Sequence, residues 1–186
     1  MLDETGEKKL QENIFLELEN QKGRFGIFTG VSESLLIDSS YNAGSESMKK
    51  MIDNTCDLQK KLFSERKIIF VFGEMREVGE VSEKLHKELY EYAKPFGEII
   101  SVGADTKTYF GSHLGNFRSS RDAGSFLKKY LAEQSEKYLV LFKGSQNTIF
   151  LEEAIKQVLK NKTDEKNLVR QETYWLEAKE KFFSEN

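Results

Sequence analysis

Two short, uninterrupted apolar runs constrain the fold of this chain more than any other feature. One spans residues 67–72 and ends at Gly73, and the other spans residues 138–142. A strand without polar alternation is apolar on both of its faces, which is typical of the inner strands of a parallel sheet. The chain is therefore expected to build a sheet that carries a layer of helices on each side.

Segments with helical spacing alternate with these runs along the chain. Apolar residues recur every three or four positions over 48–62, 81–92, 123–131 and 151–159, and a short helix is expected from Asp105 towards Phe110. Further strands are expected at 25–28, 35–37, 98–102 and 116–118, the first two as a hairpin through 30–34. Ser45 is the expected cap of the first helix, and Ser119 or Ser120 caps the third. The alternation predicts an α/β fold, a Rossmann-like, open, mainly parallel sheet with helices on both faces.

The length of 186 residues accommodates one ordinary domain and a short appendage. Residues 1–22 are highly charged and are interpreted as a lead-in, or linker, from a preceding central domain. The domain itself is expected over 23–160. Beyond it, Leu168, Trp175, Ala178 and Phe182 lie at helical spacing and predict a C-terminal helical appendage over 161–186. This helix is expected to dock onto the domain, or else to offer its aromatic stripe to a partner.

Charge and composition exclude several classes of function. The 28 basic and 31 acidic residues give a net charge of -3, without the basic field that non-specific nucleic-acid binding requires. No apolar stretch approaches the ~20 residues of a membrane span, and no secretion signal is visible at the N-terminus, so a cytoplasmic location is expected. Cys56 is the single cysteine and is interpreted as a packing residue. His86 and His113 have no metal-ligand spacing, and no metal site is expected from this chain.

Polar loops follow three of the expected strands, at the edge where open α/β sheets bind ligands. They have the sequences IDSSYNAGSESM (37–48), FGEMREVGEVSEKLH (72–86) and LFKGSQNT (141–148). Each has a structural interpretation as well: an Asx turn with a helix cap, a solvated acidic loop, and a solvated lysine at a strand end. The loop after Val102 lies at the same edge. Neither G-x-G-x-x-G nor G-x-x-x-x-G-K-[ST] occurs in the sequence, which argues against a dehydrogenase or a self-sufficient ATPase.

Together, the three loops resemble motifs of the Mur ligase family, specifically of the branch that joins D-alanyl-D-alanine to a UDP-N-acetylmuramoyl-tripeptide. The first is similar to D-S-Y-N-A-N-P-x-S-M and the second to G-D-M-x-E-L-G-x-x-S-x-x-x-H. The third, extended to LFKGSQNTIFLEEAI, is similar to K-G-S-R-x-M-x-M-E-x-V. The motifs occur in the same order over residues 23–159. Three ordered matches are more specific than any one of them.

The resemblance implies a cytoplasmic enzyme of peptidoglycan synthesis, in which ATP converts a peptide carboxylate to an acyl phosphate that the amine of D-alanyl-D-alanine attacks. The matching part is the C-terminal domain of three, which closes over a central ATPase domain and presents the amine substrate. ATP and Mg²⁺ would be bound mainly by that central domain, which is a partner together with the two substrates. The 186 residues by themselves are expected to be inactive.

The resemblance also assigns site residues. Asp38, Tyr41 and Asn42 would approach the nucleoside end of ATP or the amine substrate, Lys143, Gly144 and Ser145 would line the same cleft, and Glu77 and His86 would hold its second loop. The sequence departs from the family at three places. N-A-N-P becomes Asn42-Ala43-Gly44-Ser45, the aspartate of G-D-M becomes Glu74, and the arginine of K-G-S-R becomes Gln146. The last change removes a bidentate anion binder from the third loop.

Two other functions are weighed against this one. A stand-alone binding module could keep the fold and use either the cleft or the helix around Trp175 to engage a partner. A nucleotide-binding oxidoreductase on a similar sheet is the weaker alternative, because the glycine fingerprint of such enzymes is missing.

Overall fold

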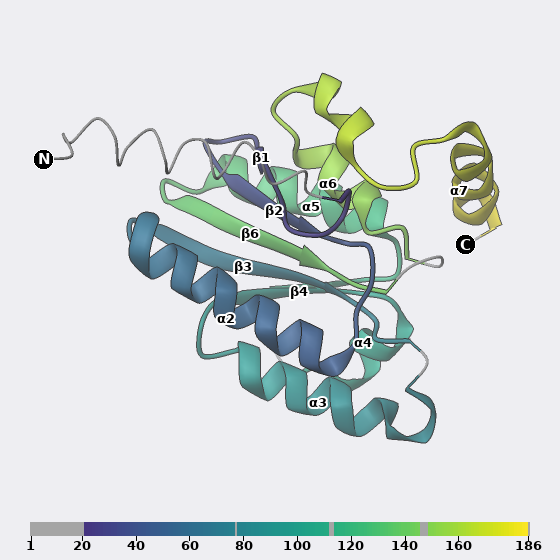
Figure 1. The fold of residues 1–186 in the computed structure, drawn as a ribbon, viewed down its shortest axis with the longest axis horizontal. Helices are drawn as coiled ribbons and strands as arrows, with labels where there is room; N and C mark the ends of the chain where they lie inside the picture. Colours follow the sequence, from purple (N-terminus) through teal and green to yellow (C-terminus); the bar gives the residue numbers. More distant parts are fainter. Residues whose placement is uncertain (1–20, 77, 112–113, 146–148, 186) are drawn as a thin grey trace, which may run out of the picture.

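A six-stranded sheet forms the centre of the computed structural model, which describes residues 21–76, 78–111, 114–145 and 149–185 (Figure 1). The strands are β1 (Gly26–Thr29), β2 (Leu35–Ser39), β3 (Arg66–Gly73), β4 (Glu98–Val102), β5 (Gly115–Phe117) and β6 (Lys137–Lys143). Their order is β1-β2-β6-β3-β4-β5. β1 pairs antiparallel with β2, and the other neighbours are parallel. The α/β fold with a mainly parallel sheet and an N-terminal hairpin is confirmed.

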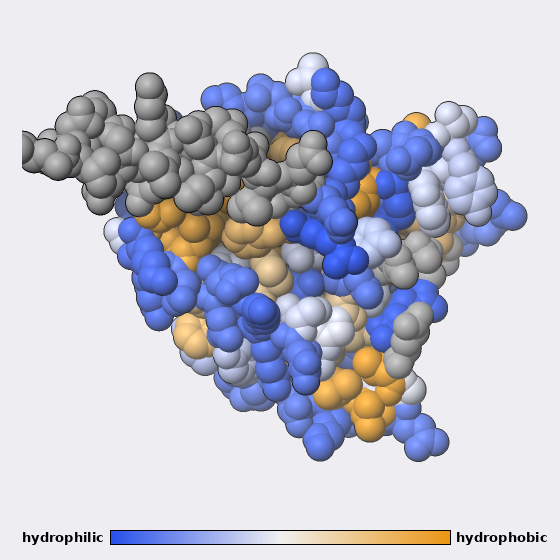
Figure 2. All heavy atoms as spheres, in the orientation of Figure 1, coloured by the Kyte–Doolittle hydropathy of each residue, from blue (hydrophilic) through white to orange (hydrophobic). Residues whose placement is uncertain are grey.

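Helices cover both faces of this sheet. They are α2 (Ser45–Leu62), α3 (Ser82–Ala93), α4 (Ala104–Tyr109), α5 (Ser120–Glu133), α6 (Glu152–Val158) and α7 (Thr173–Glu185), with 3₁₀ turns at Gly79–Val81 and Lys162–Asn167. α2 and α3 lie on one face, and α5 and α6 lie on the other (Figure 1). Hydrophilic side chains dominate the outward side of α2 and α3 (Figure 2). No helix in the described ranges is long and apolar enough to cross a membrane.

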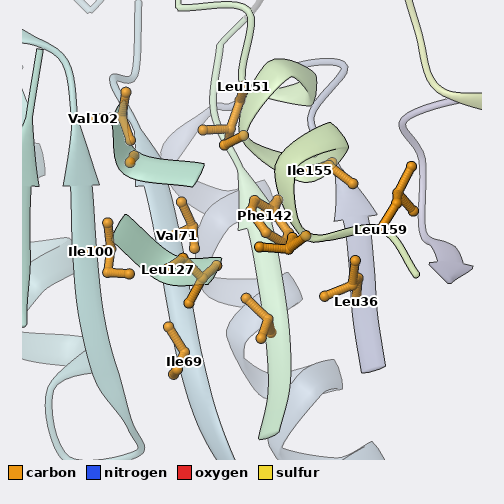
Figure 3. Close-up of a cluster of buried hydrophobic side chains, with 14 of the residues drawn as sticks. Leu36, Ile69, Val71, Ile100, Val102, Leu127, Phe142, Leu151, Ile155 and Leu159 are labelled. Carbon is orange, nitrogen blue, oxygen red and sulfur yellow. The ribbon is translucent and has the colours of Figure 1, made fainter. Parts of the chain in front are cut away.

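The inner strands are apolar throughout because each contributes to two cores. In β3, Ile69 and Val71 face α5 and α6, whereas Phe70 and Phe72 face α2 and α3. Figure 3 shows the first of these cores, in which Leu127 of α5 lies over Val71 and Ile69. Side chains alternate along a strand, so a strand covered on both sides needs apolar residues at every position. This is the physical basis of the uninterrupted runs in the sequence.

The ends of the helices show where sequence reasoning was right and where it was wrong. Ser119 caps α5, since its Oγ accepts a hydrogen bond from the Arg121 amide at 3.2 Å. The cap of α2 is Gly44 and not Ser45 as expected. The Ser47 Oγ accepts a hydrogen bond from the Gly44 amide at 3.0 Å and donates one to the Gly44 carbonyl at 2.9 Å. The side chain that bonds the backbone at the start of α2 is therefore Ser47, in the first turn, and not Ser45.

The C-terminal helix begins later than expected. Leu168 was counted among its apolar positions, but α7 starts at Thr173, and Leu168 is buried in the core beneath α5 and α6. Leu168 lies in an extended connection, and its apolar character reflects the core rather than a helix face. The division at residue 160 stays a prediction. Residues 1–20 of the expected lead-in lie outside the described ranges.

The contact between α5 and α6 provides a test of the packing. Gly124 of α5 lies so close to α6 that a Cβ atom would come within 2.7 Å of the Ala154 carbonyl oxygen and 2.8 Å of its Cα. Gly124→Ala should destabilise the protein by about 1–3 kcal/mol in urea unfolding, because overpacking outweighs the ~1 kcal/mol gain in helix propensity. Ser125→Ala, at the exposed neighbouring position, is the control and should change stability by less than about 0.5 kcal/mol. Equal effects of the two changes would contradict this account of the contact.

Candidate functional site

Lys143 is the centre of a cationic cleft at the carboxyl ends of β2 and β6. It is the last residue of β6 and pairs in register with Ser39, the last residue of β2. Although it is only 4% exposed, its Nζ donates to the Asn42 carbonyl at 2.9 Å and to the Ser39 Oγ at 3.3 Å. Burial lowers the pKa of Lys143 from its ordinary value of 10.5 to about 8, and the nearby positive charge of Arg24 adds to this shift.

The cleft around Lys143, called here the Lys143 cleft, has a volume of about 350 Å³. Its polar lining comes from the segment before β1, the loop after β2 and one side of α2: Arg24, Tyr41, Asn42, Ser47, Lys50 and Asn54. Three of the described lining residues are cationic, and no Asp or Glu is among them. The Arg24 guanidinium lies 4.6 Å from the centre of the Tyr41 ring, and Tyr41 is 39% exposed. The cleft can therefore accept a phosphate or carboxylate group and offers an aromatic surface beside it.

Ser145 joins the three motif loops to one another. Its Oγ donates to the Ala43 carbonyl at 3.2 Å and accepts from the Arg76 amide at 3.0 Å, while its own amide donates to the Glu74 carbonyl at 3.0 Å. The loops after β3 and β6 can come this close only because residue 144 is glycine: a Cβ at Gly144 would lie 2.9 Å from the Gly73 Cα. Ser145 and Gly144 thus lie behind the Lys143 cleft and hold its walls together, rather than lining it.

His86, on α3, supports the loop after β3 through a hydrogen bond to its main chain. It is fully buried in α3, its Nε2 accepts a hydrogen bond from the Met75 amide at 3.1 Å, and its Nδ1 lies 2.8 Å from the Ser82 carbonyl. An accepting Nε2 requires the tautomer that carries its proton on Nδ1, which then donates to Ser82. A buried ring with both nitrogens engaged fits a supporting role. Glu77, which was expected to act with it, lies outside the described residues.

Asp38 lies apart from the other expected site residues. Side chains alternate along β2, so Asp38 faces α5 and α6 with Leu36, whereas Ser39 and Lys143 face α2. It is fully buried, and its Oδ1 accepts from the Ser40 amide at 2.9 Å. Burial raises the pKa of its carboxyl, against the lowering effect of the hydrogen bonds from Ser40. The structure therefore brings Tyr41, Asn42 and Lys143 together and places Asp38 on the opposite face of the sheet. There its hydrogen bond with the Ser40 amide fixes the turn that follows β2.

Sequence reasoning missed two cations of the cleft, Arg24 and Lys50. Arg24 comes from the segment that precedes β1, and Lys50 follows Ser47 and precedes Asn54 at helical spacing on α2. The polar stripe formed by Ser47, Lys50 and Asn54 was a usable signal, because three polar residues at helical spacing border the apolar face of α2. Arg24 had no such signal, since the hairpin alone brings it to Tyr41.

A second and larger cavity, about 850 Å³, lies at the carboxyl ends of β3, β4 and β5. Glu74, Asp105, Arg118 and Arg121 contribute charge to it, and Phe182 and Phe183 of α7 form an apolar wall. Ser82 donates to the Asp105 carboxylate at 2.6 Å, and the Glu74 carboxylate accepts from the Asp105 amide at 2.9 Å. The loop after Val102, expected at this edge of the sheet, contributes to this cavity and not to the Lys143 cleft.

Comparisons with known proteins identify relatives of this chain. It is 28% identical over 148 residues to the UDP-N-acetylmuramoyl-tripeptide–D-alanyl-D-alanine ligase of Borreliella burgdorferi, a match that covers 78% of this chain and 29% of that protein. The MurF ligase of Thermotoga maritima, solved in complex with ADP, superimposes with a TM-score of 0.63 at 22% identity, over 76% of this chain and 31% of that one. MurF from Acinetobacter baumannii superimposes with a TM-score of 0.56 at 25% identity, over 75% and 30%. No protein-family profile matches.

These matches confirm the resemblance to the Mur ligases that the three motifs indicated, and the fold is consistent with the C-terminal domain of those enzymes. The chain spans about 30% of the length of the relatives it matches. Because the match covers only that fraction, the activity of the whole relatives reaches this chain only as a proposal.

The burial of Lys143 predicts how stability depends on pH. Below about pH 8 the amine is charged in the folded and the unfolded chain, and its burial opposes folding; the penalty fades as the pH rises from about 8 towards 10.5. Lys143→Met should therefore stabilise the protein at pH 7 by roughly 1–3 kcal/mol, net of lost hydrogen bonds, and lose this advantage near pH 10. Urea unfolding at the two pH values measures the difference. Lys50→Met, at an exposed position of the same cleft, should stay within about 0.5 kcal/mol of the parent at both.

Proposed function

We propose that this chain, which is similar to MurF ligases over about three quarters of its length, acts as the C-terminal domain of an ATP-dependent ligase. The ligase would join D-alanyl-D-alanine to a UDP-N-acetylmuramoyl-tripeptide in peptidoglycan synthesis, in the cytoplasm. The observation that supports this most strongly is the Lys143 cleft. Its three cations and Tyr41 come together at the carboxyl edge of the sheet, and Tyr41 and Lys143 belong to two of the three family motifs.

In this proposal the cleft binds an anionic group and orients it. Lys143 and Lys50 hold a phosphate of the nucleotide or the carboxylate of the incoming dipeptide, and Arg24 stacked on Tyr41 forms the opposite wall. Asn42 keeps Lys143 in place through its carbonyl oxygen. Ser145, Gly144 and His86 hold the loops behind the cleft, and Asp38 shapes the turn that leads into it. Closure of this domain over a central ATPase domain would exclude water from the acyl phosphate.

The described residues do not fit a magnesium site of their own. Mg²⁺ takes oxygen ligands, above all carboxylates, and the described lining of the Lys143 cleft has none. Within the described ranges, no group of three or more His, Cys, Asp or Glu side chains is placed to hold a metal ion. In the proposed enzyme the metal that accompanies ATP would therefore be held by the central domain.

One observation favours the alternative of a stand-alone binding module. Tyr174 is 71% exposed and Leu176 is 41% exposed on α7, which leaves an aromatic and an aliphatic side chain in water. A module of this kind would retain the fold and engage another protein through α7. It would have no need of the cationic cleft, so substitutions in the cleft distinguish the two functions.

Turnover tests the proposed function directly. The 186-residue chain alone should release no phosphate from ATP in the presence of both substrates, because it contains no phosphate-binding loop. The same sequence placed behind a Mur ligase central domain, which does contain that loop, should release phosphate only when D-alanyl-D-alanine is added. Turnover by the 186 residues alone would refute the proposal.

The contribution of Lys143 can then be measured in the longer chain. Lys143→Met should lower kcat/KM by about 10–100-fold, since it removes a charge-assisted contact worth roughly 1.5–3 kcal/mol. Lys49→Met is the matched control, because Lys49 lies on the same helix as Lys50 but does not line the cleft. Equal activity of the two variants would favour the binding-module alternative.

A further inference from the structure

Arg170 has an unusual backbone conformation in a buried position. It lies in the connection before α7, has a φ of 54° in the left-handed region, and is 7% exposed. A residue with a Cβ adopts this conformation at a cost of about 1 kcal/mol or more, and it persists only where the surroundings hold it there. The contacts of Arg170 show what holds it.

Both the side chain and the backbone of Arg170 are held. Its Nε and Nη2 donate to the two carboxylate oxygens of Glu152 at 2.8 and 2.6 Å, a bidentate pair. Its carbonyl oxygen accepts from the Lys179 Nζ at 2.8 Å. Lys179 belongs to α7, is 1% exposed, and lies 2.8 Å from Glu152 and 2.9 Å from Glu153. Two cations and two carboxylates thus fasten the connection and α7 to the first turn of α6.

The third contact of the Arg170 guanidinium reaches the loop that carries Tyr41 and Asn42 into the cleft. Its Nη2 also donates to the Ser40 carbonyl at 3.2 Å. Ser40 directly precedes Tyr41 and Asn42, and the Asn42 carbonyl is the acceptor of Lys143. A short stretch of main chain therefore separates the buried ion pairs on the α6 side of the sheet from the Lys143 cleft on the α2 side.

We propose that Arg170 is a positioning residue for the Lys143 cleft, and that Lys179 holds Arg170 in place, so that α7 is part of the support of the cleft. Arg170 fixes the position of the main chain at Ser40, and this places Tyr41 and the Asn42 carbonyl beside Lys143. Its effect on ligand binding rests on the proposed function, whereas its effect on the geometry of the cleft does not.

The nature of the contacts supports positioning over simple stability. A buried ion pair is often no more stabilising than well-packed apolar residues of the same size, but its hydrogen-bond geometry specifies where the partners lie. An apolar side chain at position 170 could fill the same space. It could not hold the Glu152 carboxylate and the Ser40 carbonyl together in one planar arrangement.

The experiment uses the 186-residue chain, labelled with ¹³C at the ε-carbon of lysine, and follows the titration of Lys143 by NMR. The Lys143 resonance is assigned as the one that is lost in Lys143→Arg. In the parent chain the midpoint should lie near 8. In the double variant Glu152→Met/Arg170→Met, which leaves neither partner of the pair as an unpaired buried charge, it should rise by roughly one unit because a loosened loop admits water to Lys143. Amide exchange at residues 40–43 should become about tenfold faster.

Two further variants separate positioning from stability. Lys179→Met leaves Arg170 with Glu152 but removes the bond to its carbonyl, and it should shift the Lys143 midpoint in the same direction by a smaller amount. Lys156→Met is the matched control: Lys156 lies 2.7 Å from Glu153 at the edge of the same cluster, and within the described ranges it makes no hydrogen bond or ion pair with Arg170 or Ser40. It should leave the midpoint unchanged.

An unchanged Lys143 midpoint and unchanged exchange at 40–43 in a folded double variant would overturn the role of Arg170. An equal shift in Lys156→Met would overturn it too, because the effect would then be one of general stability. Titration with ADP keeps the proposed function separate. If ADP perturbs no resonance of the cleft in the parent chain, the proposed function is weakened, while a raised midpoint in the double variant still supports the positioning role.

Discussion

The insertion of β6 between β2 and β3 is the constraint on which the rest of the structure depends. β6 pairs in parallel with both neighbours, so its carboxyl end meets the ends of two strands that lie far from it in the sequence. The close approach of Gly73 and Gly144 lets the loops at these ends touch. From there the loop after β6 runs to α6 on one face, and the loops after β2 and β3 run to helices on the other. A crevice at the carboxyl edge follows from this divergence.

Buried charge is used for two different purposes around that crevice. Lys143 is buried next to neutral acceptors, in a cleft whose other charges are also positive. Its charged amine is therefore less stable in the folded chain than in water, and its pKa is lowered. Such a group gains from an anion. The cluster of Arg170, Lys179, Glu152 and Glu153 is instead internally paired and has no need of a ligand. The first arrangement is suited to binding and the second to holding parts of the chain in register.

The three loop motifs predicted which segments meet, but not which side chains face one another. Asp38 and Ser39 are neighbours in the first motif, and the two-residue repeat of a strand sends them to opposite faces of the sheet. The sequence does not give the register of β2 against β6, so it did not indicate whether Asp38 or Ser39 lies beside Lys143. Arg24 illustrates a second limit, because its place beside Tyr41 depends on the hairpin that folds the segment before β1 back onto the loop after β2.

The sequence by itself determined the layered α/β fold, the number and order of the elements from the hairpin to α6, and the three loops at one edge of the sheet. These follow from local periodicity, because an apolar run that lacks alternation must be covered on both faces. Only the tertiary structure decided that Lys143 is buried in a cleft with two other cations and that Arg170 reaches Ser40 from a segment 130 residues away. Contacts of that kind depend on strand register and on how α7 docks, and no periodicity within one segment encodes the partner that another segment supplies.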